Sequence, residues 1–118
     1  MENQHRKIAG YRELSQEEID LMNRIKAAGA ELLILAAELQ GRLSTDLECK
    51  QDAARRSMAG KEYNGLPYTE HTGASEECHE FRRFVAAEPL RWAAIGKTDI
   101  QTGIMALVRA VAQPAGGV

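Results

Sequence analysis

The chain has 118 residues, of which 44% are hydrophobic, 27% are charged and only 5% are aromatic. This length is sufficient for one small domain, or for one protomer whose core is completed by further copies. The formal net charge of -2 weighs against non-specific binding of duplex nucleic acid, because such binders carry a surplus of basic residues. No apolar run approaches the ~20 residues that span a bilayer, and residues 1–7 lack the apolar core of a secretion signal. We therefore expect a soluble protein of the cytoplasm.

The chain starts with a polar stretch, residues 1–14, that is expected to form an N-terminal arm. The next four residues, Ser15-Gln-Glu-Glu18, form a capping box. In this motif the Ser15 hydroxyl accepts a hydrogen bond from the backbone N–H three residues on, and Glu18 accepts one from the N–H of Ser15. The motif predicts that a helix begins here.

A long apolar seam follows, in which the residues alternate steps of three and four. Its members are Met22, Ile25, Gly29, Leu32, Ala36, Leu39 and Leu43. The seam predicts a first long helix over 15–43, roughly 40 Å in length at 1.5 Å per residue. Further apolar residues beside the seam make this helix too apolar for a compact monomer. We expect a second long helix on one side and another subunit on the other.

The middle of the chain, residues 44–87, is expected to be a variable excursion with short helices and a loop. Weak periodicity predicts a short polar helix within 44–60. Residues that break regular structure predict a loop over 60–75, and they are Gly60, Asn64, Gly65, Pro67 and Gly73. Ser75 is a candidate N-cap for a short helix that meets a kink or brief break before the final helix.

The last long helix is expected over residues 88–113. Pro89 is tolerated in a first helical turn, and Pro114 cannot continue a helix. Lys97 lies on its apolar stripe and Thr98 lies beside the stripe. Burying polar groups without partners costs free energy, so these residues indicate that the helix does more than pack. The expected fold is all-α: a helical hairpin of two long antiparallel helices with a short N-terminal arm, forming a single helical domain over 1–118.

No arrangement of residues predicts catalysis or a metal site. Cys49, His71, Cys78 and His79 match no zinc-binding spacing. No Ser/His/Asp or Cys/His arrangement is evident either. We expect a protein that is not an enzyme and that requires no metal or cofactor.

Two places have side chains suited to an anionic, base-containing ligand. Lys26 borders the first seam and Tyr11 lies on the arm, so an ammonium group for a phosphate and a ring for a base could come together. The alternative is that Lys26 is a solvated flank residue and Tyr11 a hydrophobic staple on the helix start. Arg91 lies in the first turn of the last helix, where free N–H groups favour anions.

The alternative for this second place is purely structural. Trp92 would then be a core anchor, and Arg91 and Lys97 would form ion pairs with Glu88 or Asp99.

Two segments, Ile8–Lys26 and Arg91–Pro114, closely resemble the phage anti-CBASS sponge family. CBASS is a bacterial defence in which a sensor makes cyclic oligonucleotides that activate a cell-killing effector. The resemblance implies a small helical protein that binds and sequesters these messengers without cleaving them. It also implies a homohexamer with cyclic dinucleotides between paired protomers and cyclic trinucleotides where three protomers converge. The family's threonine shortly after Lys26 is replaced here by Ala28.

Residue by residue, the resemblance implies that Tyr11 stacks a base and Lys26 contacts a phosphate in the dinucleotide pocket. Arg91 would serve the trinucleotide pocket. Lys97 and Thr98 are candidates for the same pocket, with a role in holding the assembly as their alternative. The implied ligands include cGAMP and cyclic tri-adenylate, and the implied location is the cytoplasm of the infected bacterial host.

Two other functions remain open from the sequence. A helical interaction protein that docks a host protein is the main alternative, and a hydrolase acting on the same messengers is another.

Overall fold

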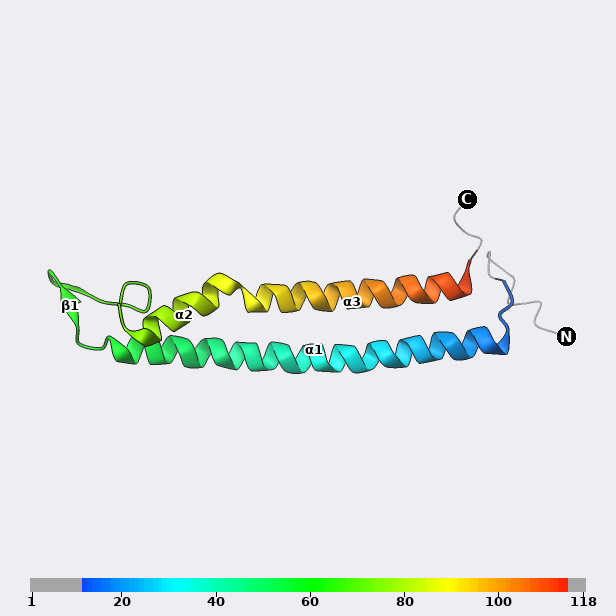
Figure 1. Ribbon diagram of the computed structural model, residues 1–118, viewed down its shortest axis with the longest axis horizontal. Coiled ribbons are helices and arrows are strands. Elements are labelled where there is room, and N and C mark those ends of the chain that lie inside the picture. Colours follow the sequence, from blue (N-terminus) through cyan, green and yellow to red (C-terminus); the bar gives the residue numbers. More distant parts are fainter. Residues whose placement is uncertain (1–11, 115–118) are drawn as a thin grey trace. The chain divides into compact units, whose positions relative to one another are not determined.

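The computed structural model describes residues 12–114. Its regular elements follow one another in the order α1 (Gln16–Ser57), β1 (Glu62–Tyr63), β2 (Leu66–Pro67), α2 (Glu76–Ala87) and α3 (Pro89–Ala112) (Figure 1). The described chain is therefore mostly helical, as the sequence predicts.

Contacts along the chain group the described residues into two compact units. Unit 1 contains residues 12–36 and 96–114, and unit 2 contains Ala37–Ile95. The division cuts both long helices. Helix α1 is divided after Ala36 and helix α3 before Gly96, so each helix has one segment in unit 1 and another in unit 2. In unit 1 these two helices run side by side in opposite directions (Figure 1), and the antiparallel pairing predicted for the two long helices is present there.

The capping box at the start of α1 is confirmed. The Ser15 hydroxyl accepts a hydrogen bond from the Glu18 N–H at 3.1 Å, and the Ser15 N–H donates to Glu18 Oε1 at 2.9 Å. These two bonds satisfy backbone donors that the first helical turn leaves without intrahelical partners. Helix α1 accordingly begins at Gln16.

The predicted end of the first helix at residue 43 is wrong, because α1 continues to Ser57. No Gly or Pro interrupts residues 44–57, so nothing in the backbone chemistry stops the helix there. Ion pairs one turn apart support it, from Arg42 to Asp46 at 3.8 Å and from Arg56 to Asp52 at 2.7 Å. The separate short helix expected within 44–60 is the end of this same helix.

The loop expected over 60–75 contains a small antiparallel hairpin. Glu62 pairs with Pro67, and Tyr63 pairs with Leu66. Between the strands, Asn64 and Gly65 have φ values of 53° and 81°. An Asn-Gly pair with positive φ at both positions is the preferred two-residue connection of a tight hairpin. These residues break the helix as predicted, and they also make a regular turn.

Unit 2 contains the buried core of the described chain, formed where α2 packs on the last turns of α1. The core residues are Ala54, Met58, Cys78 and Phe81, with Leu47 and Tyr68 packed against them. Gly73 lies so close to this cluster that a Cβ there would be 2.6 Å from Met58 Cγ. The chain therefore needs a glycine at this position to pass the core.

The boundaries of α2 and α3 agree with the sequence. Ser75 caps α2 by accepting a hydrogen bond from the Cys78 N–H at 3.0 Å. Glu88 ends α2 in the left-handed conformation, with φ 52° and ψ 49°. This residue makes the break expected before the final helix, and Pro89 then starts α3.

Unit 1 has very little buried surface of its own. Among its described residues only Gly29 is buried, and this glycine has no side chain to bury.

Within residues 12–114, no helix combines the length and apolarity needed to cross a bilayer.

Candidate functional site

The predicted dinucleotide-pocket residues are Tyr11 and Lys26. Tyr11 lies outside the described residues. Lys26 is exposed on α1 in unit 1, and it makes no ion pair or hydrogen bond with another described residue. Its ammonium group can therefore approach a phosphate without first leaving a carboxylate of the described chain.

An apolar groove lies next to Lys26 in unit 1. Both helices contribute to it, through Ile25, Ala28, Gly29 and Leu32 of α1 and through Ile100, Gly103, Ile104 and Leu107 of α3. Ala28 lines this groove and contributes a methyl group to its apolar wall. The groove offers contact surface and no charge, and Arg24 and Lys26, which flank Ile25 in the chain, are the cations of α1 that adjoin it in sequence.

The residue that follows Tyr11 is firmly held. Arg12 donates hydrogen bonds to the Ala112 carbonyl from Nε at 3.0 Å and to the Val111 carbonyl from Nη2 at 2.7 Å. The same guanidinium pairs with the Glu18 carboxylate, at 3.3 Å from Nη1 and 2.5 Å from Nη2. Hydrogen bonding from Arg12, and then from the Ser15 N–H, lowers the pKa of Glu18 to about 2. This cluster is not predictable from local sequence, because Arg12 and the Val111 and Ala112 carbonyls are far apart in the chain.

The predicted trinucleotide-pocket residue Arg91 lies in the first turn of α3. Its side chain is 59% exposed, and Nη1 is 3.4 Å from a carboxylate oxygen of Glu88. Its guanidinium carbon also lies 5.2 Å from the centre of the Trp92 ring. The ion pair with Glu88 expected in the structural alternative is confirmed. The interpretation of Trp92 as a core anchor is wrong for the single chain, because this residue is 59% exposed.

Lys97 and Thr98 are exposed on α3, and their side chains make no hydrogen bond or ion pair with another described residue. In unit 1, Gly29 of α1 lies level with Ile104 of α3. From that level, Lys26 and Lys97 lie in opposite directions, about 15 Å apart along the helix pair at 1.5 Å per residue. Unit 1 of a single chain therefore does not bring these two lysines together.

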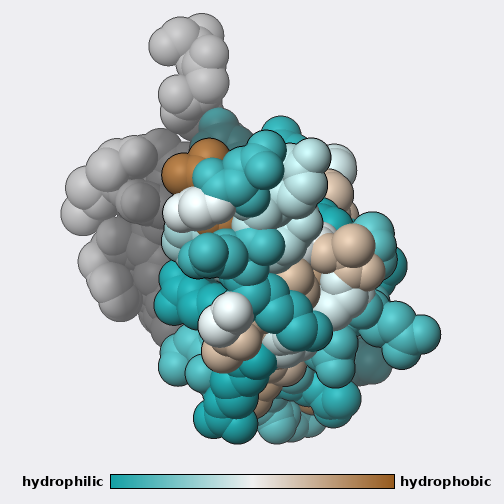
Figure 2. All heavy atoms as spheres, turned by 90° about the vertical axis from the view of Figure 1, so that its left-hand side faces the viewer, coloured by the Kyte–Doolittle hydropathy of each residue, from teal (hydrophilic) through white to brown (hydrophobic). Residues whose placement is uncertain are grey.

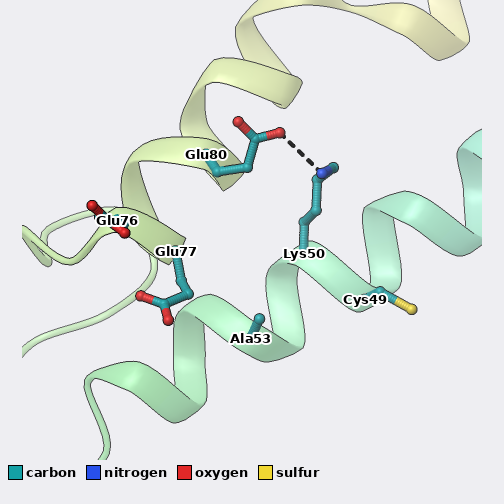
Figure 3. Close-up of a pocket in the computed structure, with 6 residues that line it drawn as sticks. All are labelled: Cys49, Lys50, Ala53, Glu76, Glu77 and Glu80. Atoms are coloured by element: carbon teal, nitrogen blue, oxygen red, sulfur yellow. Dashed lines mark ion pairs between the residues drawn. The ribbon is translucent and has the colours of Figure 1, made fainter.

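A hollow in unit 2 has an acidic lining instead. It is lined by Cys49, Lys50, Ala53, Glu76, Glu77 and Glu80 (Figure 3). Glu80 points toward Lys50, whose Nζ lies 2.9 Å from its carboxylate. Hydrogen bonding from Arg83, and then from Lys50, lowers the pKa of Glu80 to about 2. Three carboxylates line this hollow, and its one lysine is already paired with Glu80. The hollow is therefore unsuited to an anionic ligand.

Glu70 is a buried charged residue to which no sequence motif points. It is 6% exposed. Gln51 donates to its carboxylate at 3.0 Å and Arg55 at 2.8 Å, while Arg82 donates to its carbonyl at 3.0 Å. These bonds tie the segment after the hairpin to α1 and α2, which is a structural role.

The face of unit 2 that carries the hairpin is mainly hydrophilic (Figure 2).

The rejected metal ligands are dispersed or otherwise engaged. Cys78 is in the core and Cys49 is exposed. His71 packs edge-on against Phe81 at 5.5 Å, and Arg82 Nη2 lies 3.2 Å from His79 Nδ1. Within the described part of the chain, no group of three or more potential metal ligands is gathered.

Comparison with known proteins identifies relatives of the chain. Residues 67–112 match the family described as Acb2/Tad1, hairpin domain. The chain is also 67% identical, over 116 residues, to Anti-CBASS protein 2 of Pseudomonas phage JBD67. That match covers 98% of this chain and 99% of the relative. It therefore extends through residues 44–87 as well as the two segments in which the resemblance was found. The chain belongs to the phage anti-CBASS family represented by Anti-CBASS protein 2.

Proposed function

We propose that this protein is a sponge for cyclic oligonucleotides. In the cytoplasm of an infected bacterium it binds and sequesters cyclic dinucleotides and cyclic trinucleotides without cleaving them, and so keeps them from the CBASS effector. The observation that carries the proposal is the 67% identity to Anti-CBASS protein 2 over nearly the whole of both chains. The placement of the basic side chains adds physical support.

The proposal includes assembly into a homohexamer, and the exposed apolar surface supports self-association. Large exposed side chains occur along both long helices: Leu21, Leu32, Ile34, Leu35, Leu39, Met105 and Leu107. Unit 1 buries only Gly29 among its described residues, so its helix pair has almost no core of its own. Further copies of the chain would cover this surface and contribute the missing hydrophobic stabilisation.

The dinucleotide pocket follows from two-fold symmetry. A cyclic dinucleotide has two phosphates and two bases related by a near two-fold axis, so a two-fold interface presents one Lys26 and one Tyr11 to each half. Each stacked base contributes about 1–3 kcal/mol. Because Lys26 has no partner among the described residues, it loses no ion pair there when it binds phosphate.

The trinucleotide pocket follows from three-fold symmetry. Three copies of Arg91 match the three phosphates of the ring, since the planar guanidinium suits phosphate geometry. The exposed Lys97 and Thr98 are additional candidates for contact with this ligand. A pre-assembled hexamer would bind with little ordering cost, which favours high affinity.

The test measures both removal and recovery of the messenger. The purified protein is incubated with cGAMP or cyclic tri-adenylate, and the unbound ligand is quantified after ultrafiltration. The protein is then denatured and the released nucleotide is analysed by chromatography. Depletion followed by intact recovery is the expected result. Linear fragments would indicate a hydrolase, and a lack of depletion would favour a protein that docks a host protein; either result contradicts the proposal.

A further inference from the structure

Trp92 presents an aromatic ring to solvent in the first turn of α3. It is 59% exposed, and it is the single tryptophan of the sequence. The two phenylalanines of the same unit, Phe81 and Phe84, are buried, so Trp92 lies outside the core of unit 2. Aromatic rings contribute most when they are covered. The open ring therefore indicates a surface that receives a partner.

An arginine already lies over this ring. The guanidinium carbon of Arg91 is 5.2 Å from the ring centre of Trp92, within the range of a cation–π contact. More than half of Trp92 stays exposed with the guanidinium in this place, so the indole keeps open surface for a second planar group. Its Nε1–H has no hydrogen-bond partner among the described residues, and this donor is also available to a ligand.

Tyr63 is the useful comparison, because it is the other aromatic residue of the described chain that is strongly exposed, at 66%. No cation of the described chain lies over its ring. Within residues 12–114, an exposed ring and a cation are therefore in cation–π contact only at Arg91 and Trp92.

We propose that Trp92 is a base-stacking residue of the cyclic trinucleotide pocket. The inference rests on the proposed function, in which Arg91 binds a phosphate of that ring. Each nucleotide of the ligand carries one phosphate and one base, and each protomer supplies one Arg91 and one Trp92. Three protomers around a three-fold axis therefore offer one cation and one aromatic face to every nucleotide. Arg91 contacts the phosphate, and the indole stacks on the adjoining base.

The alternative is that another copy of the chain covers Trp92, and the two roles require different properties of the side chain. Packing between copies requires apolar bulk, which a leucine also supplies. Stacking on a base requires a π-face, which a leucine lacks. The backbone N–H of Trp92 donates to the Glu88 carbonyl at 3.1 Å. The residue is thus held in a helical turn, and a leucine there changes the side chain while leaving this backbone bond.

The experiment uses the full-length protein, in which intrinsic tryptophan fluorescence reports on Trp92 alone. Excitation at the red edge of indole absorption avoids the absorption of adenine. Cyclic tri-adenylate and cGAMP are titrated separately, and calorimetry measures both affinities without an optical signal. Cyclic tri-adenylate is expected to quench the fluorescence with the calorimetric affinity, while cGAMP leaves it unchanged. Calorimetric binding of cyclic tri-adenylate without quenching would overturn the inference.

Three variants separate stacking from packing. Trp92→Leu is expected to weaken cyclic tri-adenylate binding by about tenfold or more, and Trp92→Phe to lie between it and the original protein, because phenylalanine retains a smaller π-face. Both are expected to change cGAMP binding by less than about twofold. Tyr63→Leu is the matched control and is expected to bind both ligands normally. Light scattering after size-exclusion chromatography reports the assembly state of every variant.

Normal binding of cyclic tri-adenylate by Trp92→Leu overturns the inference. Equal loss of both ligands, together with smaller species in light scattering, also overturns it, because the ring then holds copies of the chain together.

The failure of the inference can be told from the failure of the proposed pocket by means of Arg91→Ala. If Arg91→Ala loses cyclic tri-adenylate and Trp92→Leu binds it normally, the pocket stands and Trp92 has no stacking role. If Arg91→Ala binds cyclic tri-adenylate normally, or the original protein does not bind it, the proposed pocket itself fails and the inference fails with it.

Discussion

Gly29 of α1 and Ile104 of α3 lie so close together that a Cβ at position 29 would be 2.3 Å from Ile104 Cδ1 and 2.6 Å from Cγ1. The seam of the first helix therefore includes a glycine because the second helix needs that space. This close approach sets the level at which the two helices pair in unit 1, and it brings the walls of the apolar groove together.

We predict that Gly29→Ala destabilises the protein, although alanine is the better helix former. Overpacking against Ile104 costs about 1–3 kcal/mol, which exceeds the gain of about 1 kcal/mol in helix propensity. The control is Gly41→Ala on the same helix, where a Cβ meets no atom within 4 Å. Urea denaturation is expected to show a lower midpoint for Gly29→Ala and an unchanged or higher midpoint for Gly41→Ala. Equal midpoints would contradict the close packing.

The carboxylate of Glu88 lies 3.4 Å from Nη1 of Arg91, so in the proposed trinucleotide pocket it would compete with a phosphate for that residue. We predict that Glu88→Gln tightens the binding of cyclic tri-adenylate by up to about fivefold, the range expected for an exposed ion pair. Glu76→Gln is the control, because Glu76 is an exposed glutamate on α2. Titration calorimetry at two salt concentrations measures the effect, which is expected to shrink at high salt. A weaker affinity in Glu88→Gln would argue against the competition.

Stability is predicted to fall in acid through the paired carboxylates. The pKa of Glu70 is lowered from 4.5 to about 2, first by its own backbone N–H and then by Gln51 and Arg55. A carboxylate whose folded-state pKa is depressed stabilises the fold above its unfolded value, and this contribution is lost as the pH falls toward the folded value. Thermal unfolding midpoints should therefore decline between about pH 4.5 and pH 2. Glu70→Gln is expected to show a shallower decline, and an identical slope would contradict the assignment.

Assembly is predicted to depend on the exposed apolar face of α1. Leu35→Glu places a charge at a residue that is 60% exposed in the single chain, and burying that charge between copies would be costly. Leu66→Glu is the control, because Leu66 is 72% exposed on the hairpin. Light scattering is expected to find smaller species for Leu35→Glu only. An intact assembly in Leu35→Glu, or dissociation in Leu66→Glu, would place the interface elsewhere.

Local signals in the sequence predicted the helix starts correctly. The capping box at Ser15, the N-cap at Ser75 and the proline at position 89 each act through neighbours within one helical turn. The same kind of signal was missing at the end of α1, where only a polar composition indicated a boundary and the helix in fact continues to Ser57.

The contacts that sequence reasoning missed join distant segments. Arg12 binds the carbonyl of Ala112, and Glu70 binds Arg55 across fifteen positions of the chain. Neither partner could be chosen from spacing or composition, because the pairs exist only after the helices have packed. The ligand-binding roles of Lys26, Arg91, Lys97 and Thr98 stay predictions. All four residues are exposed, and Arg91 is paired with Glu88.

The central claim is that copies of this 13.0 kDa chain assemble into cages that hold cyclic oligonucleotides. Analytical ultracentrifugation of the protein with a fluorescent cyclic dinucleotide tests it most directly. The account predicts that the fluorescence sediments with a species about six times the mass of one chain, and that excess unlabelled ligand displaces it intact. A protein that remains a monomer while the labelled ligand stays unsedimented would contradict the account.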